Sequence, residues 1–339
     1  MYRRKNPRRT AAMLLFALAF CVLPRSLANA AVALPELTRL SRLTLALSMG
    51  QPPAEERERP PQVWVLHRLP KPEAAPEPKK EPLAFTADEA DALAVAGNSG
   101  KTIDKAALLC RPRTFSLAPD APSVLIVHTH TSEAYTQSAG WTYRETDPLR
   151  TDESEYSVVR VGKEIAETLA ERGVLSLHDG SVNDRPDYNA SYARCGERTK
   201  TLLAEHPSVQ VVLDVHRDAA EDAAGNQTGE VVRVGDEQTA RLMLVVGTDA
   251  GGREHPDWQE NLSLALKLQA LGERRAPGLF RPIDLRRERF NQQLSPGALL
   301  VEVGSAGNTL PQALSAARIF AELLAEVVTD GASGTAIAD

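Results

Sequence analysis

The sequence predicts an α/β fold with a mainly parallel sheet and helices on both of its faces. From residue 123 onward, short apolar runs of strand length alternate with amphipathic stretches of helix length. Polar side chains follow three of the runs directly: 124–127 is followed by His128-Thr129-His130, 209–215 by His216, and 298–301 by Glu302. In open α/β sheets ligands bind outside the carboxyl ends of the strands, so we expect a functional site at this edge.

The individual elements follow from the spacing of apolar residues. Residues 156–172 carry apolar side chains such as Val158, Ile165 and Leu169 at helical intervals and stop before Gly173. The same criteria predict further helices at 191–206, 258–271 and 310–328. The remaining extended segments are predicted at 174–177, 240–247 and 282–290.

The regions before residue 123 have a different composition. Residues 1–30 combine basic side chains, an apolar run over 11–23 and an Ala-x-Ala pattern, which is typical of a signal peptide or a membrane anchor. Either segment would place the rest of the chain outside the cytoplasm. Residues 31–85 are rich in proline and charge and are predicted to be an extended linker. We therefore divide the remainder into a small extension (86–122), the main domain (123–329) and a tail (330–339).

Charge and cysteine content exclude some classes of protein. The 339-residue chain has a formal net charge of −6, which gives no support for a nucleic-acid partner. Of its three cysteines, Cys21 lies in the N-terminal apolar run, and Cys110 and Cys195 lack any zinc-binding spacing. We expect the latter two to be unlinked thiols, with a disulfide between them as the alternative. Any zinc must therefore be held by histidines and carboxylates.

The strand ends offer the ligands of a catalytic zinc site, which needs three protein ligands and one open position for water. His130 and His216 fit as two of them. Several carboxylates could provide the third: Glu133, Glu145, Asp152, Glu153 and Glu155. Glu302 fits the role of a proton shuttle that does not touch the metal.

Each of these residues also has a simpler interpretation. A histidine at a strand end can be a surface or capping residue. His128 can be the hydrogen-bonding partner that fixes the tautomer of His130. Glu302 can neutralise Arg217 as part of a buried ion pair.

Five motifs resemble those of the stage II sporulation protein P family: VLIVHTHTSEAY (124–135), DYNASYARC (187–195), VVLDVHRDA (211–219), RLMLVVGTD (241–249) and FNQQLSPGALLVEVGSAGNTLPQAL (290–314). The resemblance covers residues 123–328. It implies an amidase/phosphorylase-hydrolase-like fold and a zinc-dependent N-acetylmuramoyl-L-alanine amidase that acts on peptidoglycan when the forespore is engulfed. It also implies endopeptidase activity, a membrane segment near the N-terminus and a lytic transglycosylase partner, sporulation protein D.

The resemblance assigns roles to individual residues. It makes His130 and His216 metal ligands and Glu302 the catalytic residue. The family's metal-binding glutamate opens a helix, and Glu153 is the nearest match, although Ser157 replaces the expected asparagine. Glu133 and Asp152 remain alternatives for this third ligand.

The resemblance thus implies an extracytoplasmic zinc hydrolase, membrane-anchored or secreted, that cleaves the bond between muramic acid and L-alanine. Two other functions stay open. One is a non-catalytic scaffold of the cell envelope that binds peptidoglycan or a partner. The other is a carboxypeptidase-type zinc enzyme, in which Arg217 would bind a terminal carboxylate.

Overall fold

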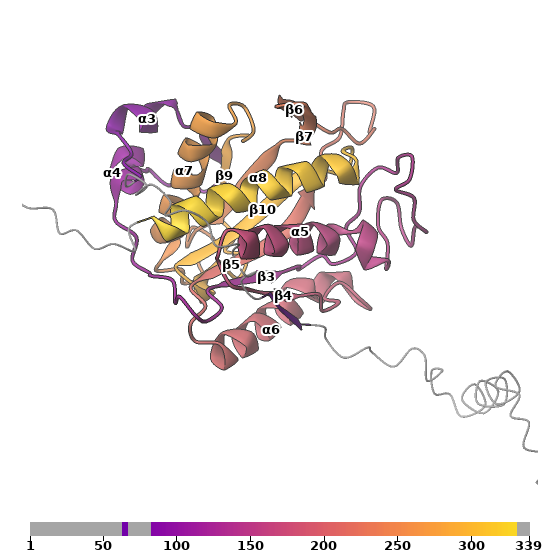
Figure 1. Ribbon diagram of the computed structural model, residues 1–339, viewed down its shortest axis with the longest axis horizontal. Helices are drawn as coiled ribbons and strands as arrows, with labels where there is room; N and C mark the ends of the chain where they lie inside the picture. Colours follow the sequence, from indigo (N-terminus) through magenta and orange to yellow (C-terminus); the bar gives the residue numbers. More distant parts are fainter. Residues whose placement is uncertain (1–62, 67–82, 331–339) are drawn as a thin grey trace, which may run out of the picture. The chain divides into compact units, whose positions relative to one another are not determined.

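The computed structural model describes residues 63–66 and 83–330 (Figure 1). The predicted signal or anchor, most of the linker and residues 331–339 of the tail lie outside the described residues. Within the described ranges, no helix has the length and apolar character needed to cross a membrane.

An eight-stranded sheet forms the centre of the domain, in the order β1-β4-β3-β5-β10-β8-β9-β2 (Figure 1). Its strands are β1 (Val63–Leu66), β2 (Val95–Gly97), β3 (Val124–Val127), β4 (Ser176–Asp179), β5 (Val211–Asp218), β8 (Leu242–Gly247), β9 (Ile283–Arg286) and β10 (Gly297–Ser305). Five of the seven pairings are parallel, and only β1–β4 and β10–β8 are antiparallel. The prediction of a mainly parallel sheet is confirmed.

The helices cover both faces of this sheet, as predicted. They are α3 (Ala87–Ala92), α4 (Lys105–Cys110), α5 (Val158–Glu171), α6 (Ser191–Glu205), α7 (Trp258–Arg275) and α8 (Leu310–Thr329). Helices α5 and α8 run side by side over one face, with α7 next to α8, while α6 lies on the other (Figure 1). Short 3₁₀ turns occur at η3 (Ser154–Tyr156), η4 (Tyr188–Ala190) and η5 (Gln292–Leu294), and the hairpin β6 (Val231–Val234)–β7 (Glu237–Ala240) forms a separate small sheet.

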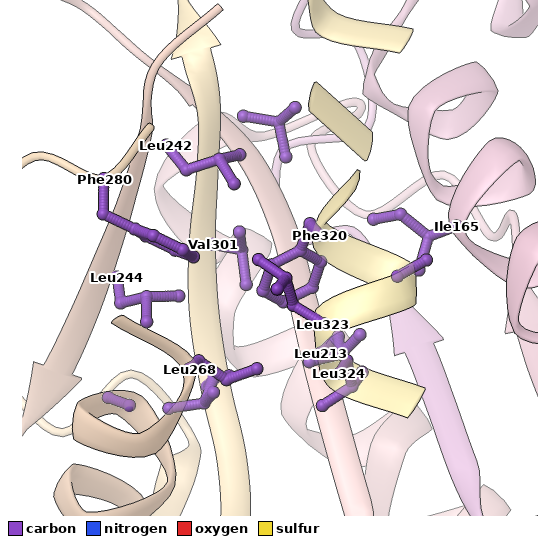
Figure 2. Packing of buried hydrophobic residues seen from close by; sticks show 14 of the residues in the cluster. Ile165, Leu213, Leu242, Leu244, Leu268, Phe280, Val301, Phe320, Leu323 and Leu324 are labelled. Atoms are coloured by element: carbon purple, nitrogen blue, oxygen red, sulfur yellow. The ribbon is translucent and has the colours of Figure 1, made fainter. Parts of the chain in front are cut away.

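Alternation along the strands divides the interior into two clusters. In β5, Leu213 and Val215 point into the large cluster beneath α5, α7 and α8, and Val212 points into a small cluster beneath α6. Figure 2 shows Leu213 and Val301 in the large cluster together with Phe320 of α8. Because side chains alternate with period two, the even-numbered positions of β5 and β10 face α6. Asp214, His216 and Glu302 are therefore on the face with the smaller apolar core.

One part of the linker is folded, contrary to the prediction. Val63 to Leu66 form β1, which pairs antiparallel with β4 at the edge of the sheet. The segment VWVL consists of β-branched, aromatic and aliphatic residues, which fit a strand, and the Trp64 ring lies 5.1 Å from that of His178. Cys110 and Cys195 are both free thiols, as expected.

Candidate active site

His130 and His216 come together at the carboxyl edge of the parallel strands, on the face that α6 covers. Their ring centroids are 5.3 Å apart and the rings are nearly perpendicular, at 85°. His216 lies within β5, whereas His130 lies three residues beyond the end of β3. Glu302 is the direct neighbour of His216 in the parallel pairing of β10 with β5. The sequence predicted that these three residues would meet, and the structure confirms that placement.

His216 is buried between two carboxylates. Its Nδ1 is 3.3 Å from Glu133 Oε2, and its Nε2 is 3.0 Å from Asp214 Oδ1, although this second contact is not aligned for a hydrogen bond. Burial disfavours the charged imidazole, but the two carboxylates outweigh it and raise the pKa of His216 well above its usual value. Asp214 itself is fixed by the backbone N–H and the hydroxyl of Thr129, at 2.8 and 2.6 Å.

His130 has a different environment. Its Nε2 is 3.1 Å from the Tyr188 hydroxyl, and the two rings stack with centroids 4.3 Å apart. Its Nδ1 is buried and has no hydrogen-bond partner among the described residues. Burial lowers the pKa of His130 to about 4, so the imidazole is neutral at pH 7, the state that metal binding requires.

Glu302 is half-buried, with its Oε2 atom fully buried, and its carboxyl group keeps its proton more readily than usual. Burial is the main reason that its pKa is raised to about 8, and the nearby charge of Glu133 acts in the same direction. Its Oε2 has no hydrogen-bond partner within the described ranges. Within the described ranges no ion pair joins Glu302 to Arg217, which was the simpler interpretation of Glu302. The Arg217 side chain instead donates to the carbonyls of Ala134 and Leu149.

The structure does not bring Glu153, the predicted third ligand, to the histidines. Glu153 is exposed, and its carboxylate accepts a hydrogen bond from the backbone N–H of Arg144 at 2.9 Å. Asp152 is also exposed and pairs with Arg185 at 3.4 Å. Glu133, the other alternative, is 5% exposed and contacts His216 directly. Of Glu153, Asp152 and Glu133, only Glu133, on the loop after β3, contacts a histidine in the described structure.

One interpretation of the sequence made His128 the hydrogen-bonding partner of His130, but in the structure His128 bonds to other groups. Its Nδ1 is 3.1 Å from the carbonyl of Val215, and its Nε2 is 2.9 Å from Nε2 of His178. Since a carbonyl only accepts, His128 donates from Nδ1 and accepts from His178. The hydrogen bond from His128 to the Val215 carbonyl holds the end of β3 against β5, one residue before His216.

Sequence reasoning missed several residues of the site. Asp214 precedes His216 by two positions, so strand periodicity alone could have placed it on the same face. Tyr188 and Tyr192 lie in one of the quoted motifs, but nothing in their spacing indicated that they face the histidines. Arg150 links the loop to the site, because its guanidinium lies 3.5 Å from Glu133 and 3.6 Å from Asp184.

The donor types fit zinc, but the described residues do not form a finished metal site. Within the described ranges, no three His, Cys, Asp or Glu side chains are grouped closely enough to hold a metal. The chemistry is nevertheless suitable, because two imidazoles and a carboxylate are the usual ligands of catalytic zinc. The buried, unpartnered Nδ1 of His130 is the observation that points most directly to a missing ligand.

These features define an α/β protein with a buried histidine–carboxylate site at the carboxyl edge of a mainly parallel sheet. The chain belongs to the stage II sporulation protein P family, whose sequence profile matches residues 56–325. The stage II sporulation protein P of Bacillus subtilis (strain 168) is 27% identical over 222 residues, which are 62% of this chain and 52% of that protein. The chain thus matches about half the length of this curated relative.

Two solved structures are similar at a much lower level. An N-acetylmuramoyl-L-alanine amidase from Clostridium difficile 630 is 13% identical, with a TM-score of 0.36, over 63% of this chain and 99% of that one. An N-acetylmuramoyl-L-alanine amidase of Nostoc punctiforme is 12% identical, with a TM-score of 0.35, over 61% and 94% of the two chains. Similarity at this level does not indicate what the present chain does.

Proposed function

We propose that this chain is a peptidoglycan hydrolase that cleaves the amide bond between N-acetylmuramic acid and L-alanine during sporulation. The observation that carries the proposal is the buried group of His130, His216 and Glu133, with Glu302 beside it on the next strand. Membership of the stage II sporulation protein P family supports the sporulation context. The activity itself was implied by the resemblance of the sequence motifs.

The residues that would hold zinc are His130, His216 and Glu133, and His216, whose pKa its two carboxylate neighbours raise, would release its proton as the metal binds. Glu133 replaces Glu153 in this proposal because its carboxylate already contacts His216 Nδ1. When bound, zinc would polarise the scissile carbonyl and lower the pKa of a water molecule. Asp214 lies 3.0 Å from the opposite nitrogen of His216, and a small turn of the ring would align a hydrogen bond of the kind by which carboxylates commonly orient a metal-binding histidine.

Glu302 would transfer the proton. Glu302 would act in its ionised form, in which the unpartnered Oε2 accepts a proton from the attacking water, and its raised pKa makes that carboxylate a stronger base than an exposed one. The same oxygen can return the proton to the amide nitrogen as the C–N bond breaks. The wall of α6 and the loop after β3 would limit the access of bulk water to this step.

The location and partners belong to the same proposal. The N-terminal 30 residues would export the domain and either anchor it in the membrane or be removed. A lytic transglycosylase of the sporulation protein D type would be its partner, since cleavage of the glycan and of the peptide link complement each other. The main rival is a non-catalytic envelope scaffold, and the buried histidine–carboxylate group counts against it.

Digestion of purified peptidoglycan tests the proposal directly. We expect mass spectrometry to find stem peptides with a free L-alanine N-terminus and glycan strands that have lost them. A chelator should stop the release, and added zinc should restore it. Cleavage inside the stem peptides instead would identify an endopeptidase, and binding without any product from zinc-loaded protein would identify a scaffold.

A further inference from the structure

Tyr192 stands beside both histidines without any role so far. It lies in the first turn of α6, and its ring centroid is 5.5 Å from that of His130 and 6.4 Å from that of His216. The ring is edge-on to His130, at 86°, and nearly parallel to His216, at 16°. Tyr192 therefore forms one wall of the site.

The hydroxyl of Tyr192 is unusual among the tyrosines around the site. The hydroxyl of Tyr135 donates to the carbonyl of Val303, that of Tyr143 donates to the carbonyl of Tyr135, and that of Tyr188 contacts His130. By contrast, no hydrogen bond of the Tyr192 hydroxyl is found in the part of the chain that the structure describes. The Tyr192 hydroxyl thus has no protein partner within the described residues, and the ring that carries it lies beside both histidines.

The neighbouring backbone holds Tyr192 in place at a conformational cost. Phe290 packs against its ring at 5.8 Å, and the Asn291 side-chain amide donates to its carbonyl at 2.8 Å. Both residues adopt positive φ, 50° and 59°, which is strained for the bulky Phe290 and better tolerated by Asn291. Gly196 leaves room for this contact, because a Cβ there would lie 2.8 Å from Asn291 Oδ1. Such strain is typically retained where a residue must be held in a functional position.

The other donors at the site are already engaged. Arg150 faces the carboxylates of Glu133 and Asp184, and the Arg217 side chain donates to two backbone carbonyls. An amide hydrolase needs a donor aimed at the carbonyl oxygen, because negative charge develops there as water adds. A phenol is protonated at neutral pH and can supply that hydrogen bond without losing its proton.

We propose that Tyr192 is a catalytic residue whose hydroxyl donates a hydrogen bond to the oxygen of the scissile carbonyl as the tetrahedral intermediate forms. The inference rests on the proposed function. In this step the water oxygen bonds to the carbonyl carbon and the π electrons move to the carbonyl oxygen. The proton of the water passes to Glu302 and then to the leaving nitrogen, while Tyr192 keeps its own proton.

Replacement of Tyr192 by phenylalanine tests this role, because only the hydroxyl is removed. On stem-peptide release from purified peptidoglycan, Tyr192→Phe should lower kcat by about 10²–10³-fold, the usual effect of losing one such donor, with KM nearly unchanged. Binding of a phosphinate that mimics the tetrahedral intermediate should weaken by a similar factor. Zinc content and the unfolding midpoint should match the wild type.

Tyr143→Phe is the matched control, since it removes the hydroxyl of a tyrosine on the loop after β3 that has no place in the mechanism. It should leave kcat and phosphinate binding within about 2-fold of the wild type, a change of roughly RT ln 2. Asn291→Gly keeps the positive φ but removes the bond to Tyr192, and should lower kcat less than Tyr192→Phe does.

Three results would overturn the inference: an unchanged kcat in Tyr192→Phe, a raised KM alone, or loss of zinc. The first would make Tyr192 a wall residue, the second a substrate-binding residue, and the third a support of the metal site. A wild-type protein that releases no product would instead reject the proposed function, and with it this role. The two failures are therefore distinguishable in the same experiment.

Discussion

The two faces of the central sheet use alternate residues of the same strands for different purposes. The face under α5, α7 and α8 holds a large apolar cluster, with Leu213 and Val301 buried against Phe320 (Figure 2). The α6 face holds a much smaller apolar cluster and, next to it, the buried Asp214 and His216 and the half-buried Glu302. Buried polar atoms without partners are destabilising, so the large cluster must provide the free energy that lets the other face keep them.

The largest effect is expected from the histidines of the α6 face. Each of His130→Ala and His216→Ala removes one of three proposed ligands, and zinc should be lost from both variants. Elemental analysis of protein purified without added metal measures the zinc content of each variant. The fold should persist, because the large cluster lies on the other face. Normal zinc in both variants would remove the metal site from this edge of the sheet.

The carboxylates of the loop after β3 allow a matched comparison. Glu133→Gln should weaken zinc binding by more than the roughly 10–100-fold that loss of an outer partner costs. Glu153→Gln should leave the zinc affinity unchanged, because Glu153 is exposed and bonded to the Arg144 backbone. Competition with a chromophoric chelator measures both affinities. The opposite ranking would restore Glu153, the ligand that the sequence suggested.

Glu302 separates catalysis from metal binding. Glu302→Gln keeps the size of the side chain but removes the base, so turnover should fall by about 10²–10⁴-fold. Zinc content and peptidoglycan binding should stay near wild type, since Glu302 is proposed to act on the water and not on the metal. If zinc disappears as well, Glu302 is a ligand; if turnover is normal, another carboxylate carries the proton.

The contrast between the faces can be measured as stability. Phe320 is fully buried in the large cluster, and Phe320→Ala should lower the free energy of unfolding by about 3–5 kcal/mol. Leu202 of α6 is 2% exposed but belongs to the small cluster, so Leu202→Ala should cost less, near the lower end of about 2–5 kcal/mol. Urea unfolding compares the two. Equal losses of unfolding free energy in the two variants would mean that both faces contribute alike to the stability of the fold.

The parts of this molecule that the sequence predicted are those that local pattern determines. Apolar runs that end in His128 and Glu302 indicated strands, and parallel pairing then required their ends to share one edge. This logic was sufficient to bring His130, His216 and Glu302 together, although their chemical roles stay predictions. Helix spacing likewise placed α5 within two residues of its observed start, at Val158 instead of Tyr156.

The parts that the sequence did not predict depend on contacts between distant residues. Glu133 reaches His216 because the loop after β3 folds back, with Arg150 bridging to Glu133 and with Leu149 at a φ of 52°. Nothing local encodes that conformation, whereas Glu153 was assigned from the family's metal-binding glutamate, which opens a helix. The strand β1 is similar: VWVL is a strand only because the edge of β4 is free to pair with it.

The smallest predicted effect concerns Lys267, a strongly buried lysine beneath the apolar face of the described domain. Lys267 of α7 is 7% exposed, and its ammonium donates to the carbonyl of Leu108 and the hydroxyl of Ser263, at 3.3 and 2.7 Å. No carboxylate in the described ranges forms an ion pair with it. Burial therefore lowers the pKa of Lys267 from 10.5 to about 8.

The pKa of Lys267 is lower in the folded than in the unfolded protein, so the free energy of unfolding depends on pH. Below pH 8 the amine is charged in both states, and the folded protein bears the full cost of burying it. Between pH 8 and 10.5 the folded state loses its proton first, so the unfolded state binds more protons and the free energy of unfolding rises with pH. Relative to Lys267→Met, the wild type should gain up to about 1–3 kcal/mol across this interval. Lys200→Met, which removes an exposed lysine paired with Glu197, should show no such gain. Urea unfolding at several pH values between 7 and 10.5 measures the free energy of unfolding of the three proteins. A constant difference between the wild type and Lys267→Met would show that Lys267 stays charged throughout. The apolar face would then tolerate a buried charge, as the α6 face does.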